Sequence, residues 1–535
     1  MGLSRQAALR AAVGLLALTM LLLGLWQLLQ MRNGVQVQHE MVGTMPVTVW
    51  RPAVTSAAAV PAPLVVIAHG FAGSQQLMQP LALTLARNGF IAVTFDFPGH
   101  GRNPAPMTGG LADQDQSLRT LLAALAKLTA WAEPLAAPGA GYALLGHSMA
   151  SDIVVRHAQA HPEVWATVGL SLFAPSIVAD SALDSPRNLL VVSGAWEPGV
   201  MHDEALRIVG RAASSIAGPG PQERRTYGRF EDGSARRVAF AAGVEHIAVL
   251  YSADTAVEAV AWLKQAAGRP VPAQPFVAAY GPRLGLLLVG VLGLGWALAG
   301  WLPRVAAGGA PPFGATPPQA TRWRWRRFWP LALLPAAATP LLLFKLPSGL
   351  LPVELMPILL GDYLVLHFLL YGLLTAAALW WRGGAWLPSV RPAALLGSTL
   401  LVAAFGLVAV GLPGNAFVFN LSPPPVRLGV IAVLAVGTIV WFIADEALTR
   451  SPHAPPMAYF ATKLCFLLSL VGAIALNPGR LFFLALIVPA ILLLFIVYGL
   501  FSRWVWRRTA HPLVAALANG LVFAWFMALA FPLVA

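Results

Sequence analysis

The residues best suited to covalent chemistry lie in the segment Gly146-His147-Ser148-Met149-Ala150. A short apolar run, residues 142–145, precedes this segment, and a helical pattern follows it over 152–160. Where a strand turns sharply into a helix, the turn presents a serine hydroxyl and tolerates only small residues two positions before and after the serine. Those two positions carry glycine and alanine here. The pattern therefore predicts that Ser148 is a nucleophile.

A serine hydroxyl needs a base and an orienting carboxylate to become an effective nucleophile. We expect His246 to be the base, because it lies in a loop after the last predicted strand. We expect Glu197 to be the acid, because it follows the apolar run 189–194 at the carboxyl edge of the predicted sheet, where catalytic groups gather. The alternatives are Asp203, then Asp180 and Asp184, for the acid, and His202 for the base.

An oxyanion hole is expected in His69-Gly70-Phe71-Ala72-Gly73-Ser74, which follows another buried apolar run. Glycines in such a loop allow backbone N–H groups to turn toward a substrate oxygen. The expected donors are the amides of Phe71 and Met149, and removing one such donor typically lowers the rate by ~10²–10³.

Together with Asp96-Phe97-Pro98-Gly99-His100-Gly101, these motifs resemble those of the α/β-hydrolase superfamily, in particular its dienelactone-hydrolase-like and serine-aminopeptidase-like members. The resemblance covers residues 35–265. It implies an α/β-hydrolase fold, a triad of Ser148, Glu197 and His246, and hydrolysis through an acyl-enzyme. We expect no cofactor and no metal. Ala150 and Glu197 depart from the more usual glycine and aspartate, and the second departure leaves Asp203 open as the acid.

The elements that must position these residues are β-rich runs that alternate with helical patterns between residues 35 and 275. This alternation predicts a mostly parallel sheet with helices on both faces. A hairpin turn is expected at Asp232-Gly233 within 226–240. The expected strands are 46–50, 64–69, 91–95, 142–145, 167–173, 189–193 and 237–241, and the helical patterns between them are 77–88, 114–131 and 151–161.

The composition assigns much of the chain to lipid. Of its 535 residues, 58% are hydrophobic and only 11% are charged, whereas a soluble protein carries about 25% charged residues. We expect an uncleaved transmembrane signal anchor over 1–34, an extracytoplasmic α/β-hydrolase domain over 35–275, and an all-α polytopic domain over 276–535. With the anchor, about nine transmembrane helices result, the other candidate spans being 284–302, 328–344, 355–381, 393–412, 427–444, 457–476, 481–501 and 511–533.

Loop charges predict the orientation, because cytoplasmic loops are enriched in Lys and Arg. If the N-terminus is cytoplasmic, the basic loops all fall inside: Arg304 with the cluster Arg322–Arg327, then Arg382 and Arg391, then Arg450, and last Arg503, Arg507 and Arg508. The opposite side holds Lys345, Arg427 and Arg480. This places the hydrolase domain outside the inner membrane. The Ala-, Leu- and Arg-rich usage indicates a bacterial source, so that "outside" means the periplasm or the outer membrane surface of the cell.

The net charge of +13 does not predict nucleic-acid binding, because the cations are scattered beside apolar runs. Ionisable residues inside lipid are costly and usually functional, which makes Asp362, His367 and Lys463 candidates for a polar path. Asp445 and Glu446 faintly resemble part of the CAAX-type intramembrane protease motif, with His511 as a further ligand, but the order along the chain is wrong for that family.

The leading hypothesis is a membrane-integrated serine hydrolase acting on an ester, a thioester or an amide, with a small-molecule or lipid-linked acyl substrate and membrane lipid as its partners. The alternative is a transporter or channel-like protein with an accessory hydrolase domain. The sequence predicts no oligomeric state.

Overall fold

The computed structural model describes residues 5–53, 61–110, 113–177, 182, 184–213, 220–307, 325–345, 356–382, 387–450 and 454–535. Contacts group the chain into two units. The sheet unit comprises Gly24–Gly285, Gly414–Pro424 and Pro532–Ala535, and the helical unit comprises Met1–Leu23, Leu286–Pro413 and Pro425–Phe531. The expected domain limits at residues 34 and 275 stay a prediction.

The sheet unit contains an eight-stranded sheet in the order β1-β2-β4-β3-β5-β6-β7-β8. The pairs β1–β2 and β2–β4 are antiparallel, and all other neighbours run parallel. The strands are β1 Val35–Val42, β2 Met45–Pro52, β3 Leu64–Ala68, β4 Ile91–Phe95, β5 Tyr142–His147, β6 Val164–Leu170, β7 Leu189–Gly194 and β8 Arg236–Ala241. Each of the seven expected runs overlaps one of them.

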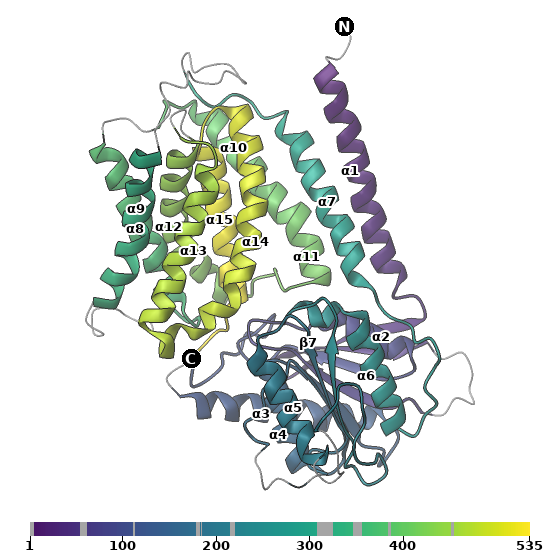
Figure 1. Cartoon of the computed structure of the whole chain (residues 1–535). Helices are drawn as coiled ribbons and strands as arrows, with labels where there is room; N and C mark the ends of the chain where they lie inside the picture. Colours follow the sequence, from purple (N-terminus) through teal and green to yellow (C-terminus); the bar gives the residue numbers. More distant parts are fainter. Residues whose placement is uncertain are drawn as a thin grey trace. The chain divides into compact units, whose positions relative to one another are not determined.

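Helices cover both faces of this sheet, as Figure 1 shows, with α2 and α6 together on one face and α3, α4 and α5 on the other. The central strands β3, β4, β5 and β7 are therefore buried along their whole length, which explains their continuous apolar runs. The predicted α/β fold class is confirmed. The helices are α2 Gln79–Arg87, α3 Gln114–Ala132, α4 Met149–Ala160, α5 Gly199–Ala213 and α6 Ala253–Ala266, with short 3₁₀ turns η1 Glu133–Leu135 and η2 Ala248–Tyr251.

Two features of the sheet differ from expectation. Strand β1 was not predicted, because half of its eight residues are polar, five are exposed, and only its last residue is buried. The expected hairpin around Asp232 is reduced to one antiparallel bridge between Tyr227 and Arg236. The Ser234 N–H donates to Asp232 Oδ1 at 2.9 Å, so this turn is closed by a side chain rather than by a ladder.

Two short segments far along the chain complete the sheet unit, and the sequence did not predict this. In the segment 414–424, the buried Asn420 donates from Nδ2 to the Gly101 carbonyl at 2.7 Å. In the segment 532–535, the Leu533 N–H donates to the Gly99 carbonyl at 2.8 Å, and the Leu533 carbonyl accepts from Met107 N–H at 2.9 Å. Both segments thus fix the loop after β4.

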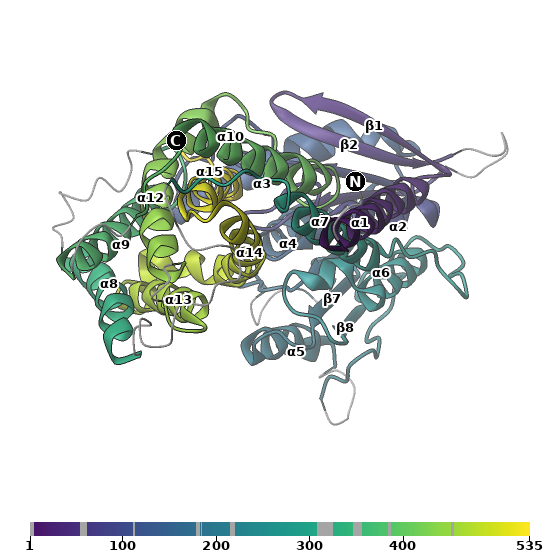
Figure 2. The same cartoon turned by 90° about the horizontal axis from the view of Figure 1, so that it is seen from above.

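The helical unit is built around α12, which packs between α9 and α15, as seen in Figure 2. Within the described residues, nine helical spans are long and apolar enough to cross a bilayer, which is compatible with a multi-pass membrane protein. The expected span 393–412 is α10, a π-helical stretch and α11 in succession. The helices are α1 Arg5–Gln30, α7 Tyr280–Ala299, α8 Trp325–Lys345, α9 Gly361–Trp381, α10 Pro392–Phe405, the π-helix Gly406–Gly411, α11 Leu412–Phe417, α12 Val426–Thr449, α13 Ala458–Leu476, α14 Pro478–Thr509 and α15 Leu513–Ala530.

Helices α1 and α7 approach closely through small residues. A Cβ added at Gly290 would lie 2.8 Å from the Ala17 carbonyl oxygen, and one added at Gly293 would lie 2.9 Å from the Ala17 Cβ. Small residues at such an interface allow two helix backbones to pack without an intervening side chain. The pairing therefore depends on glycines in α7.

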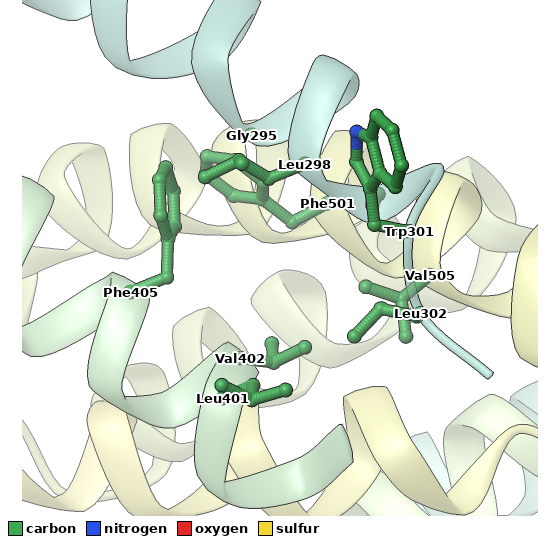
Figure 3. A pocket seen from close by; sticks show the side chains of 10 residues that line it. Gly295, Leu298, Trp301, Leu302, Leu401, Val402, Phe405, Phe501 and Val505 are labelled. Carbon is green, nitrogen blue, oxygen red and sulfur yellow. The ribbon is translucent and has the colours of Figure 1, made fainter. Parts of the chain in front are cut away.

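The helical unit also holds an apolar pocket of about 230 Å³, lined by residues of α7 and the two residues 301–302 that follow it, of α10 and of α14. Figure 3 shows the rings of Trp301, Phe405 and Phe501 around it. Its lining contains none of the three intramembrane polar residues singled out in the sequence.

Candidate active site

Ser148 lies at the sharp turn between β5 and α4. Its backbone angles, φ 53° and ψ −120°, are unusual for a residue with a side chain, and such strain is typical of a nucleophile held at the top of a sheet. A Cβ added at Gly146 would come within 2.4 Å of the Ala150 carbonyl oxygen. Glycine is therefore required two residues before the serine, whereas the buried Ala150 fits two residues after it.

The side chains of Ser148, His246 and Glu197 form one hydrogen-bonded line. His246 Nε2 lies 2.8 Å from Ser148 Oγ, and His246 Nδ1 lies 3.2 Å from Glu197 Oε2. The three residues come from the β5–α4 turn, the loop after β8 and the loop after β7. Because neighbouring parallel strands end at the same edge, the sheet itself brings these loops together.

Glu197 is held as a buried carboxylate. Its Oε1 accepts hydrogen bonds from the Ser171 hydroxyl at 2.5 Å and from the Gly194 N–H at 2.8 Å. Burial raises the pKa of this carboxyl, but the hydrogen bonds from His246, Ser171 and Gly194 outweigh burial and keep its pKa below the ordinary value. Glu197 is thus ionised at neutral pH.

The alternative residues lie elsewhere. Asp203 is exposed on α5 and Asp184 is exposed before β7, while Asp180 lies outside the described residues. His202 Nε2 donates to the Gly194 carbonyl at 2.9 Å, beside the ring of Phe240. The structure therefore brings Glu197, and not Asp203, to His246.

His147 supports the site in a way that the sequence did not predict. Its Nε2 donates to the His246 carbonyl at 2.8 Å, and the two rings lie 5.1 Å apart. Burial, reinforced by the neighbouring His246, lowers the pKa of His147 to about 3, so its ring is neutral. His147 therefore anchors the loop that carries His246. Ser171 was also missed, because it was assigned to the strand before it.

The loop expected to form the oxyanion hole lies directly against Ser148. A Cβ added at Gly70 would come within 2.9 Å of the His147 carbonyl and 3.0 Å of the Ser148 Cβ. The His69 ring fixes the base of this loop, because Nδ1 donates to the Gly70 carbonyl at 2.9 Å and Nε2 accepts from the Phe97 N–H at 3.1 Å. Gly70 thus lies so close to Ser148 that a residue with a side chain would not fit at this position.

The two expected oxyanion donors are the chain neighbours of the two residues in this contact, Gly70 and Ser148. Phe71 follows Gly70, and its ring packs edge-on to His100 at 6.2 Å. Met149 is the first residue of α4, where the helix end favours negative charge. The buried Asp96 joins the end of this loop to the loop after β4, because its carboxylate accepts from the Gln75 N–H at 2.8 Å and from the Arg102 N–H at 3.0 Å.

Comparison with known proteins identifies the family of the sheet unit. Residues 59–212 match the model of the family described as serine aminopeptidase, S33. The sheet unit is an α/β hydrolase of the serine-hydrolase type. None of the curated proteins searched matches the chain.

Solved structures similar to this α/β hydrolase include a protein described as a lipase from Acinetobacter baumannii. It is 20% identical in sequence, and its TM-score is 0.22. The similarity covers 30% of this chain and 48% of that chain. A CIB-like hydrolase from Thermoplasma acidophilum has 17% identity, 41% and 92% coverage, and a TM-score of 0.29. Epoxide hydrolase I from potato has 20% identity, 28% and 44% coverage, and a TM-score of 0.22. The chain spans about half the length of the first and third of these proteins.

The polar residues expected inside the membrane have separate partners. Asp362 Oδ2 accepts from the Met356 N–H at 3.2 Å. His367 contacts Tyr363 and Ser469, each at 3.2 Å. Lys463 pairs with Asp445 and lies 4.1 Å from the Tyr459 ring centroid.

The residues that faintly resembled a protease motif are engaged in other ways. Asp445 is paired with Lys463, and Glu446 accepts from Ser502 at 2.5 Å and from Arg450 at 3.3 Å. His511 donates from Nε2 to the Pro388 carbonyl at 2.9 Å. No group of three or more metal-ligating side chains lies in the described part of the chain. Asp445 therefore joins α12 to α13 through Lys463, and Glu446 joins α12 to α14 through the Ser502 hydroxyl.

Proposed function

We propose that the chain is a membrane-integrated serine hydrolase that cleaves an ester, a thioester or an amide through an acyl-enzyme on Ser148. The observation that supports this function is the continuous line of hydrogen bonds from Ser148 through His246 to the buried Glu197. His246 serves as general acid and base, and Glu197 orients the imidazole and stabilises its charged form.

In the first half of the reaction, Ser148 Oγ attacks the acyl carbon while its proton moves to His246 Nε2. The carbonyl electron pair moves to oxygen, which the amides of Phe71 and Met149 stabilise as an oxyanion. The oxyanion then re-forms the carbonyl, the bond to the leaving group breaks, and the leaving oxygen, sulfur or nitrogen takes the proton from His246.

In the second half, water attacks the acyl carbon and gives its proton to His246. A second oxyanion collapses, the bond to Ser148 Oγ breaks, and Oγ recovers its proton from His246. The products are a carboxylic acid and an alcohol, thiol or amine, and the enzyme returns to its starting state.

We further propose that the chain lies in the inner membrane of a bacterium with its N-terminus in the cytoplasm and the α/β hydrolase in the periplasm. The basic loops of the sequence support this orientation. Arg427, which the sequence assigns to the opposite side, is buried in α12 and donates to the Ala528 and Phe531 carbonyls, so it adds no loop charge there. Of the cluster 322–327, residues 322–324 lie outside the described residues.

Labelling with a fluorophosphonate probe tests the proposed function, because the probe reacts only with an activated serine. The full-length wild type in detergent should be labelled and Ser148→Ala should not. Ser234→Ala is the matched control, because Ser234 belongs to the Asp232 turn and should leave labelling intact. Equal labelling of wild type and Ser148→Ala would place the nucleophile elsewhere.

A further inference from the structure

Apolar side chains are exposed beside the catalytic loops. Phe173, Trp196, Val200 and Ile247, which we call the apolar rim, are 53%, 72%, 61% and 42% exposed. They follow β6, β7 and β8, which are neighbours in the sheet. Among the described residues from β1 to the end of α6, the other exposed large apolar residues are Met41 and Val257. Val271 is also exposed but lies after the end of α6. The rim is therefore concentrated at the edge that carries the triad.

Three of the four rim residues are joined to the proposed triad by the chain or by a hydrogen bond, and the fourth, Val200, lies three residues after Glu197. Trp196 directly precedes Glu197, and Ile247 directly follows His246. The Trp196 N–H also donates to the Val244 carbonyl at 3.0 Å, so the acid loop and the histidine loop are tied together at this point. Phe173 lies two residues after Ser171, whose hydroxyl donates to Glu197.

Exposed large apolar side chains confined to the loops at one edge of the sheet indicate a binding surface, because they keep contact with water that a ligand would remove. The ligand chemistry follows from the rim itself. Its four side chains carry no charge, and the only polar atom among them is the indole N–H. A polar acyl group would gain nothing from this surface, whereas a hydrocarbon chain would be removed from water along its length.

We propose that the apolar rim binds the hydrocarbon chain of a fatty acyl ester, which makes amphiphilic fatty acyl esters the substrate class of this site. This inference rests on the proposed function. The net reaction is ester plus water giving a fatty acid and an alcohol: the bond between the acyl carbon and the alcohol oxygen breaks, the water oxygen forms the new bond to that carbon, and the alcohol oxygen gains a proton.

The first arm of the test compares the hydrolysis of p-nitrophenyl acetate and p-nitrophenyl octanoate by the full-length protein in detergent. Each ester is used at concentrations below those at which it aggregates. Full burial of one methylene favours binding by about fourfold. Because the rim is open on one side, only part of that gain is expected for each methylene. We expect kcat/KM for the octanoate to exceed that for the acetate by at least about tenfold.

The second arm uses variants of the rim. Trp196→Ser combined with Phe173→Ser should lower the octanoate-to-acetate ratio of kcat/KM by about tenfold or more. A matched pair of valine variants gives the control. Val200→Ser should lower the octanoate-to-acetate ratio of kcat/KM. Val257→Ser changes another exposed valine, on α6 and outside the rim, and should leave this ratio unchanged.

The outcomes separate this inference from the proposed function. Hydrolysis of both esters that persists in Ser148→Ala would overturn the proposed function. Hydrolysis that requires Ser148 but shows no preference for the octanoate, or a preference that the rim variants leave intact, would overturn the inference alone. A loss of the preference in Val257→Ser equal to that in Val200→Ser would also overturn it, because the effect would then belong to exposed apolar residues in general.

Discussion

At the scale of single residues, the identity of the acid decides how the imidazole is held. Glu197→Gln keeps the size of the side chain but removes the charge that stabilises the imidazolium, and an amide can impose the wrong tautomer on His246. We expect kcat for p-nitrophenyl octanoate to fall by about 10³–10⁴, as for loss of the corresponding carboxylate in other triads. The control is Asp203→Asn, which changes an exposed carboxylate on α5. This variant should keep the activity of the wild type. The reverse pattern would make Asp203 the acid.

The buried His147 predicts a pH dependence of stability. The folded protein binds a proton on this ring only near pH 3, whereas the unfolded chain binds one near pH 6.5. Between these values the unfolded state holds more protons, so the free energy of unfolding must fall as pH falls, by up to about 1.4 kcal/mol per pH unit. Above pH 6.5 both states are neutral at this residue and its contribution is constant.

His147→Gln removes that titration and should flatten the dependence between about pH 6.5 and pH 4. Hydrogen exchange of peptides from β5 and α4, corrected for the intrinsic pH dependence of exchange, measures the local free energy of opening. His157 serves as a reference, because burial lowers its pKa to about 4 and its titration remains in the variant. An unchanged pH dependence in His147→Gln would contradict the assignment.

At the scale of elements, the segment 414–424 predicts a dependence of the oxyanion loop on a distant part of the chain. The buried side chain of Asn420 donates to the Gly101 carbonyl and accepts from Arg102 Nε at 3.3 Å, and its N–H donates to Ser74 Oγ at 3.3 Å. Ser74 ends the loop that starts at His69. Leaving buried partners without their hydrogen bonds costs about 1–3 kcal/mol.

Asn420→Ala keeps the backbone N–H that Ser74 accepts but removes the side-chain bonds to Gly101 and Arg102. It should therefore speed hydrogen exchange in peptides covering 96–107. Because Asp96 accepts from both the Arg102 N–H and the Gln75 N–H, exchange in 69–75 should also speed up and fluorophosphonate labelling of Ser148 should slow. Asn477→Ala, a half-buried asparagine between α13 and α14, is the matched control and should change neither. Exchange in 69–75 that matches the wild type would show that Asn420 does not position this loop.

Features that rest on a short sequence pattern could be predicted, whereas contacts between residues far apart in the sequence could not. The elbow at Ser148, the strands around it and the loops of Glu197 and His246 were predictable, because each rests on a short pattern and parallel strands bring their ends together. The bond from His147 to the His246 backbone and the docking of Asn420 were not, because each joins residues with no shared pattern. Strand β1 was missed because an exposed edge strand lacks the continuous apolar run of a buried one.

At the scale of the whole molecule, the proposed orientation can be tested by cysteine accessibility. The only natural cysteine, Cys465, is buried in α13, so an introduced cysteine reports its own position. Arg229→Cys lies in an exposed turn of the sheet unit, and Arg508→Cys lies in the last turn of α14. In intact cells whose outer membrane has been made permeable, a maleimide that cannot cross the inner membrane should label Arg229→Cys and not Arg508→Cys.

The physical reason is that cations beside a span are retained on the cytoplasmic side, and α14 ends with Arg507 and Arg508. Lysed cells are the control, because both cysteines should then be labelled to a similar extent. Labelling of Arg508→Cys alone in intact cells would invert the orientation and place the hydrolase in the cytoplasm. Its substrate would then have to come from the cytoplasmic leaflet, while the chemistry at Ser148 would be unaffected, since the triad lies wholly within the sheet unit.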